Sequence, residues 1–364
     1  MENQQRPYLQ ELDGWPIDAE IHPLPVDQWL ATSLLQKAIR RSEIGFAEQA
    51  AVALFRFRGS ATWRRFLVIA VEDIGIACPK TLIEVTGICS DKDRRRKFAG
   101  DEEAARYLAR RLAAAPKDRS ADLLTSAVCY HPWLEAVRSQ VKRLTTYDRL
   151  DWVADSSRSF CERSVAAWFA SGIGAEHKRY NGEEVRLLLT IFRDIDVPQE
   201  LIEAIAQALS RTREPFCALV PLLWLAAQSG SPHKTIAHSL APTRTVAGVP
   251  LWTLDMHTRA GRAAIQRFMR ENEAIRQVLQ ESVVHNRHAE AAHLGAFYVD
   301  GGSCATILDW PLRAEIERLG IEADFAHAGV PPDRIERLLA TFRIHVESIN
   351  DAREDALVRY LEGA

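Results

Sequence analysis

The chain has 364 residues and a mass of 40.9 kDa, enough for two domains and a sizeable hydrophobic core. Charged residues make up 26% and hydrophobic residues 47%, and the formal net charge of -3 excludes a global attraction to nucleic acid. Any DNA contact would need a local basic patch. The longest apolar run is shorter than the roughly 18 residues of a membrane span, and the N-terminus lacks the apolar core of a secretory signal. The 6 cysteines show no C-x-x-C spacing, as expected of free thiols, so we expect a cytoplasmic protein without a membrane partner.

Amphipathic helices dominate the predicted elements. Residues 1–25 are expected to form an extended arm, because Trp15-Pro16 and His22-Pro23-Leu24-Pro25 interrupt any helix. Beyond the arm, apolar residues recur with a period of about 3.6 and capping residues stand at the segment ends. The helices predicted next are Val26–Arg41, Phe46–Phe57, Thr62–Ile74, Lys80–Cys89, Asp101–Ala115 and Ser120–Cys129.

Short motifs in this part of the chain follow one another in a distinctive order. They are Gln36-Lys37-Ala38-Ile39-Arg40-Arg41-Ser42-Glu43, Trp63-Arg64-Arg65-Phe66, Glu72-Asp73-Ile74-Gly75 and Ala114-Ala115-Pro116-Lys117. Their order, over about residues 24–141, resembles the helical collar that follows the ATPase domain in the RarA/MgsA family of clamp-loader-like AAA+ ATPases. In that family the collar mediates self-assembly, and the proteins are associated with stalled replication forks. The resemblance implies a homo-oligomer whose partner is DNA or a replication or repair protein.

A phosphate-binding loop of the form G-x-x-x-x-G-K-[ST] does not occur in this chain. An ATPase of that family requires the loop, because backbone amides and a lysine must neutralise the nucleotide phosphates. We therefore expect a protein that has the collar-like region but lacks the ATPase domain, and that binds no cofactor. The predicted function is that of a non-enzymatic, self-associating accessory or interaction protein linked to DNA replication or repair.

The helical pattern continues beyond the collar-like part, so the fold class expected is all-α, a multi-helix array. Loop-forming residues between 229 and 250 predict a boundary between a helical domain over 26–230, which includes the collar-like part 26–141, and a mostly helical domain over 250–364. A short β-hairpin would fit residues 296–307. The later helices expected are Glu183–Phe192, Gln199–Arg211, Phe216–Gln228, Ala263–Leu279, Ser282–Leu294 and Pro332–Leu361.

The most basic point of the sequence is the loop before the fifth predicted helix. Its cations are Lys92, Arg94, Arg95, Arg96 and Lys97. They are the candidates for contact with a nucleic-acid backbone. Nearby acids, including Asp91, Asp93 and Asp101, favour the alternative of a solvated loop that neutralises itself.

A histidine-rich segment offers candidate metal ligands. Glu281, His285 and His288 are spaced i, i+4 and i+7, which places them on one face of a helix, and His257 could join them from the preceding element. A metal-dependent hydrolase is therefore the alternative function. The spacing matches no established metalloenzyme signature, and an exposed polar helix would look the same, so we favour the structural interpretation.

Two further polar groups have both a chemical and a structural interpretation. Asp255 and His257 could form an acid–base pair, with Arg259 and Arg262 beside them, but helix capping by Asp255 or Thr258 is favoured. The adjacent carboxylates 72 and 73 point about 100° apart on a helix and are expected to pair locally. They are expected to hydrogen-bond to the neighbouring backbone or to pair with Arg64, Arg65 or Lys80. The cations Arg40 and Arg41 are expected to complement a helix dipole, with an interface ion pair as the alternative.

Overall fold

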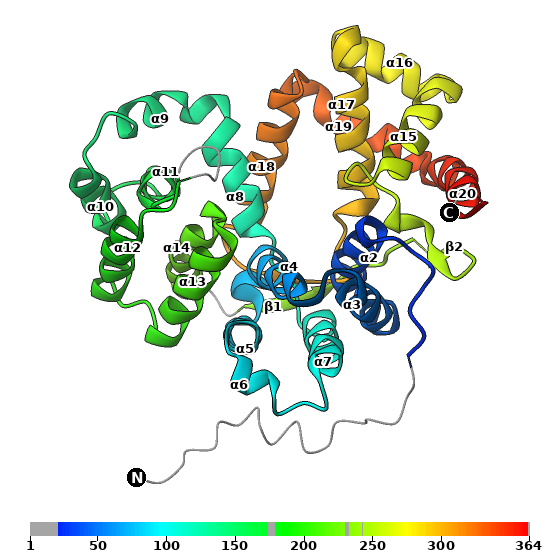
Figure 1. The fold of residues 1–364 in the computed structure, drawn as a ribbon. Helices are drawn as coiled ribbons and strands as arrows, with labels where there is room; N and C mark the ends of the chain where they lie inside the picture. The colour runs from blue at the N-terminus through cyan, green and yellow to red at the C-terminus, as the bar shows by residue number, and fades with distance from the viewer. Residues whose placement is uncertain (1–20, 174–178, 230–232, 242, 363–364) are drawn as a thin grey trace.

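The computed structural model describes residues 21–173, 179–229, 233–241 and 243–362 (Figure 1). Of the expected arm over residues 1–25, residues 1–20 lie outside these ranges, and residues 21–25 precede the first described helix without forming one. The described chain is mostly helical, which confirms the all-α fold class. None of its helices combines the length and the apolar composition needed to cross a bilayer.

The helices fall into three consecutive groups. The first contains α2 (Gln28–Arg40), α3 (Ile44–Arg58), α4 (Thr62–Ile69), α5 (Pro79–Ser90), α6 (Lys92–Arg95), α7 (Asp101–Ala114) and α8 (Ser120–Tyr130). The second contains α9 (Glu135–Val141), α10 (Thr146–Ala154), α11 (Phe160–Ala170), α12 (Gly182–Asp194), α13 (Gln199–Thr212) and α14 (Val220–Gln228). The third contains α15 (Arg259–Glu271), α16 (Glu273–Ser282), α17 (His288–Ala296), α18 (Arg313–His327), α19 (Pro332–Ile344) and α20 (Val346–Glu362).

Short helices of other types connect these elements. The 3-10 helices are η1 (Gly59–Ala61), η3 (Gly75–Ala77), η4 (Pro132–Leu134), η5 (Pro215–Leu219), η6 (Leu251–Thr253) and η7 (His285–Arg287). Two π-helices, η2 (Ala70–Ile74) and η8 (Phe297–Gly301), continue α4 and α17. The helix expected over Thr62–Ile74 therefore changes type after Ile69.

Two long helices expected in the last third are each divided into two. The segment Ala263–Leu279 breaks at Asn272, whose side chain accepts a hydrogen bond from the backbone N–H of Ile275 and so caps α16. The segment Pro332–Leu361 breaks at His345, between α19 and α20. Periodicity did not reveal these breaks, because the apolar pattern continues across them.

The strands form two short antiparallel pairs within the described chain. β2 (Thr245–Val246) and β3 (Val249–Pro250) make a hairpin, while β1 (Lys234–Ala237) pairs with β4 (Thr306–Asp309). The 296–307 stretch thus ends in a strand, but its partner lies far back in the chain and its first part belongs to η8. On the other side of β4, the backbone of Lys117 exchanges 2.9 Å hydrogen bonds with Thr306 and Leu308.

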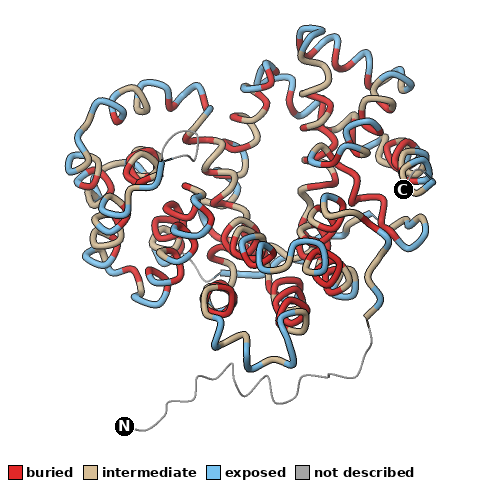
Figure 2. Tube along the Cα trace, in the orientation of Figure 1, coloured by how far each residue is buried: buried red, intermediate tan, exposed pale blue. Residues whose placement is uncertain are grey.

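Three clusters of buried apolar side chains form the core, and they appear as the inner segments of the trace in Figure 2. The first lies among α2, α3, α4, α5 and α7, the second mainly among α8 to α14, and the third among α15 to α20. Residues after 250 also enter the first two clusters, for example Trp252 and Leu357 in the first and Trp310 in the second. The core therefore crosses the boundary expected between residues 230 and 250.

The closest of these crossings joins α8 to α18, which lie side by side in Figure 1. A Cβ atom added at Gly320 of α18 would lie 2.7 Å from the carbonyl oxygen of Leu123 in α8. We expect Gly320→Ala to lower the free energy of unfolding in urea by about 1–3 kcal/mol, because backbone cannot move aside easily. In α3, Gly45 has no atom within 4 Å of an added Cβ, so Gly45→Ala is the control and should not destabilise. Equal effects of the two substitutions would contradict this packing.

Candidate functional site

A network of buried charges surrounds the C-terminal end of α2. Lys37, Arg40 and Arg41 are each less than a tenth exposed. A buried charge is costly unless an opposite charge lies beside it, and each of these cations has a carboxylate partner from elsewhere in the chain. The ion pairs are Lys37–Asp255 at 2.8 Å, Arg40–Glu72 at 2.7 Å, Arg40–Asp73 at 2.6 Å and Arg41–Asp300 at 3.2 Å. The end of α2 is thereby joined to η2, to the 254–258 loop and to η8.

The two π-helices supply three of these acids. Glu72 and Asp73 lie in η2, and Asp300 lies in η8. π-Helices are rare in proteins, and those that occur are frequently found at functional sites. The chain leaves η2 at Gly75, where φ is +47° and an added Cβ would lie 3.0 Å from the Asp118 carbonyl oxygen, so glycine is required there.

Arg119, at the start of α8, completes the network. Its Nε lies 3.4 Å from Asp73 Oδ1, and its Nη2 donates a hydrogen bond to Asp122. Its guanidinium also lies over the Phe297 ring, 5.3 Å from the centroid, while the Arg40 guanidinium lies 5.8 Å from the same centroid. Asp73 is fully buried and contacts both guanidiniums, so it is the carboxylate on which the pair of arginines depends.

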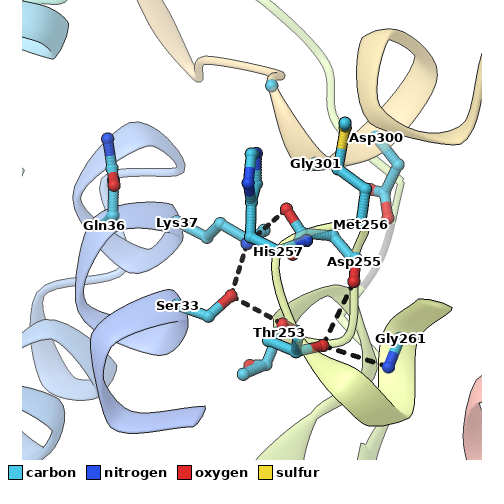
Figure 3. Close-up of polar contacts among 12 residues, drawn as sticks. Ser33, Gln36, Lys37, Thr253, Asp255, Met256, His257, Gly261, Asp300 and Gly301 are labelled. Carbon is cyan, nitrogen blue, oxygen red and sulfur yellow. Dashed lines mark hydrogen bonds and ion pairs between the residues drawn. The ribbon is translucent and has the colours of Figure 1, made fainter. Parts of the chain in front are cut away.

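On the other side of α2, Ser33 and Lys37 point toward Thr253 and the 254–258 loop (Figure 3). The Lys37 ammonium donates a 2.5 Å hydrogen bond to Ser33 Oγ, which in turn donates to the Thr253 carbonyl at 2.7 Å. Burial lowers the pKa of Lys37, and Asp255 opposes this effect. Ser33 Oγ donates to the Thr253 carbonyl and Lys37 pairs with Asp255, so these contacts join α2 to the 254–258 loop.

A pocket of about 440 Å³, here called the central pocket, opens beside this network. Its polar lining includes Gln36, Arg40, Arg58, Arg65, Glu72, Arg119, Asp122, Ser126, His257 and Asp324. Burial, with Asp73 and Asp122 nearby, raises the pKa of Glu72 to about 7, so this carboxyl can exchange a proton near neutrality. The side chain of His257 is exposed at the pocket, yet desolvation by packed neighbours still lowers its pKa.

A second hollow of about 810 Å³ adjoins the central pocket and shares Trp29 and His257 with it. We call it the Trp29 groove. It lies between α2, α15 and α20, which share one side of the molecule in Figure 1. Its polar and aromatic lining is Asp27, Trp29, His257, Thr258, Arg259, Arg262, Arg359 and Tyr360.

The sequence motif around Asp255 is divided between two roles. Thr258 caps α15, because its Oγ1 accepts a 3.0 Å hydrogen bond from the Gly261 N–H, as the capping interpretation expected. Asp255 does not cap the helix. Its Oδ1 accepts a 2.9 Å hydrogen bond from the His257 N–H, and its Oδ2 pairs with Lys37. The structure thus brings Asp255 and His257 together with the motif residue Lys37, which the sequence places far from them.

The ion pairs of the adjacent carboxylates are to an arginine that was not among the expected partners. Glu72 and Asp73 pair with Arg40 across the helix interface, whereas Arg64 contacts Glu214 and Arg65 contacts Gln36. Arg40 and Arg41 likewise form internal ion pairs, so the helix-dipole explanation does not account for them. For Arg40 and Arg41 the observed arrangement is thus an ion pair to another element, which is closer to the alternative interpretation.

The basic loop largely neutralises itself. Arg94, Arg95 and Arg96 pair with Asp91 at 3.5 Å, with Asp101 at 3.5 Å and with Asp93 at 2.5 Å. The Arg95 guanidinium also lies 4.9 Å from the Trp63 ring centroid. Lys92 and Lys97 are exposed. The five candidates therefore lie close together on α6 and the turn after it, but their arginines already have acidic partners.

The four candidate metal ligands do not share a helix face. Glu281 ends α16 and pairs with Arg337, His285 lies in η7, and His288 begins α17 with its Nε2 3.0 Å from the Val283 carbonyl oxygen. His257 lies at the central pocket instead. In the ranges that the structure describes, no group of three or more His, Cys, Asp or Glu side chains is placed to hold a metal ion.

Sequence reasoning missed several members of the charge network. Arg119, Asp122, Asp300 and Arg353 were not among the candidates, although Arg353 is fully buried and donates to Asp300. One signal was present. Asp300 follows Phe297-Tyr298-Val299, and an acid after an apolar run indicates a buried partner.

Comparison with protein-family models, with curated proteins and with solved structures found no match to this chain. The likeness to the RarA/MgsA collar therefore rests on the order of the motifs alone, and the function must be inferred from the geometry of the network, the central pocket and the Trp29 groove.

We expect Asp73→Asn to destabilise the protein by about 3–5 kcal/mol, because Arg40 and Arg119 would stay buried without their shared carboxylate. Urea unfolding followed by circular dichroism measures the change. Glu102→Gln is the control, because Glu102 pairs with Arg56 at an exposed position and its loss should leave stability nearly unchanged. A similar loss of unfolding free energy in both variants would show that Asp73 contributes no more to stability than an exposed ion-pair residue.

Glu72 should make stability depend on pH. Its pKa is raised from 4.5 to about 7 in the folded chain, so the folded state binds the proton more tightly and stability falls as pH rises through this window. Glu72→Gln removes the titration. The stability of this variant relative to the parent should therefore rise between about pH 5 and about pH 8 in urea unfolding. A constant difference across that range would contradict the raised pKa.

Proposed function

We propose that the protein is a non-enzymatic, self-associating accessory protein of DNA replication or repair that binds nucleic acid and has no ATPase of its own. The proposal rests on the structural role of the residues in the collar-like motifs. Arg40, Asp73 and Lys117, which belong to the motifs or stand beside them, are buried and hold helices together. Such a role suits a scaffold better than an enzyme.

Lys117 illustrates this structural use. It is fully buried, and its ammonium donates to the carbonyl oxygen of Ala113 at 2.9 Å, to that of Ala115 and to Ser42 Oγ at 3.3 Å. Three neutral acceptors satisfy its three N–H groups. The lysine therefore closes the C-terminal end of α7 against the start of α3, and burial lowers its pKa to about 8.

Self-association is supported by apolar side chains that remain exposed on the collar-like part. Ile44 and Phe57, near the two ends of α3, are 37% and 57% exposed. Phenylalanine is one of the residue types enriched in the buried part of interfaces between subunits. They indicate α3 as the first helix to substitute if light scattering detects an oligomer.

Nucleic-acid binding is the first property to measure. We expect the purified protein to bind fluorescein-labelled DNA in anisotropy titrations at about 50 mM salt, and the affinity to fall as salt rises because bound counterions are released. ATP should not be hydrolysed. Absence of binding to single-stranded and duplex DNA and to RNA at micromolar protein would overturn the proposal, and so would metal-dependent hydrolysis of a nucleotide.

A further inference from the structure

Trp29 is unusually placed for a tryptophan. It lies in the first turn of α2 and is 64% exposed, at the junction of the central pocket and the Trp29 groove. Its backbone is held in place, because its N–H donates a 2.9 Å hydrogen bond to the capping carboxylate of Asp27. A large aromatic ring on a rigid backbone at the edge of two hollows is suited to stacking against a ligand.

Three arginines line the groove beside this ring. Arg262 donates to the Met256 carbonyl at 3.0 Å, Arg359 donates to the Asp355 carbonyl at 3.0 Å, and Arg259 is exposed. Within the described chain, none of the three lies within ion-pair distance of a carboxylate. This contrasts with the basic loop, where each arginine has an acid beside it.

The groove has little negative charge to oppose these arginines. Among its described lining residues, Asp27 is the only acid. The Asp27 carboxylate already accepts the N–H groups of Trp29 and Leu30, which satisfies the start of α2. The positive charge of the groove is therefore available to an anionic ligand. On the central-pocket side, Arg58 and Arg65 add positive charge beside the acids Glu72, Asp122 and Asp324.

We infer that the Trp29 groove binds single-stranded nucleic acid, with an unpaired base stacked on Trp29 and backbone phosphates bound by Arg259, Arg262 and Arg359. An aromatic platform beside a positively charged groove is the combination by which proteins hold single strands without reading their sequence. A duplex keeps its base faces stacked inside and cannot offer one to Trp29. The inference rests on the proposed function, since it names the form of nucleic acid and the surface that binds it.

The test uses the full chain and a fluorescein-labelled oligothymidylate of about 20 nucleotides. Trp29→Ala should weaken binding about tenfold or more, because it removes the stacked base. Trp133→Ala is the matched control, since Trp133 is equally exposed, at 65%, but lies on η4. Trp29→Phe keeps an aromatic face and should retain most of the affinity.

A second pair of variants tests the charges. Arg259→Glu combined with Arg262→Glu should weaken binding and lower the slope of log affinity against log salt by about 1.4, which corresponds to two lost phosphate contacts on a single strand. Lys92→Glu combined with Arg96→Glu reverses the same charge in the basic loop and should leave the affinity unchanged. Circular dichroism and thermal unfolding check that every variant is folded.

The outcomes separate the inference from the proposed function. If the parent protein binds DNA but Trp29→Ala and the Arg259–Arg262 variant bind equally well, the groove is not the site and only the inference fails. A loss confined to the Lys92–Arg96 variant would also overturn it and assign the contact to the basic loop. If the protein bound duplex DNA more strongly than single strands, or bound heparin but no nucleic acid, the groove would be assigned to another polyanion. No binding to any nucleic acid would overturn the proposed function itself.

Discussion

The structure depends on three cations at the end of one helix. Lys37 and Arg40 in the last turn of α2 and Arg41 at its C-cap are each buried against a carboxylate from a different element. Removing one partner of such a pair leaves an uncompensated charge inside the protein, which costs about 3–5 kcal/mol. The pairs therefore determine where η2, the 254–258 loop and η8 can lie, and with them the three core clusters.

The same arrangement produces the two hollows. Because the end of α2 is held among η2, α8 and η8, the space between these elements is lined by side chains that serve the network, and the central pocket is polar for that reason. The Trp29 groove lies at the other end of α2, where Arg259, Arg262 and Arg359 have no ion-pair partner in the described chain. One helix thus has a structural end and an end suited to a ligand. Because the buried ion pairs and the Trp29 groove lie at opposite ends of α2, the buried charges alone do not indicate the proposed binding surface.

Much of the fold could be predicted because its signals are local. A helix needs an apolar stripe, a cap and a terminator within a few turns, and α2, α3, α5, α7, α8, α12 and α13 begin and end within a few residues of their expected positions. Breaks at Asn272 and His345 were missed because the apolar stripe continues through both. The strand β4 was placed near its position, but its partner β1 lies in a distant segment and could not be predicted from turn residues.

The sequence by itself determined most of the helices and the residues that resemble a collar, since these follow from periodicity and from side chains a few positions apart. Only the tertiary structure decided which charges meet. Lys37 pairs with Asp255 and Arg41 with Asp300, at separations for which residue spacing carries no information. A buried cation requires an anion, but many acids in the chain could have met that requirement. The packing of helix faces selected the partners, and it left the arginines beside Trp29 without one in the described chain.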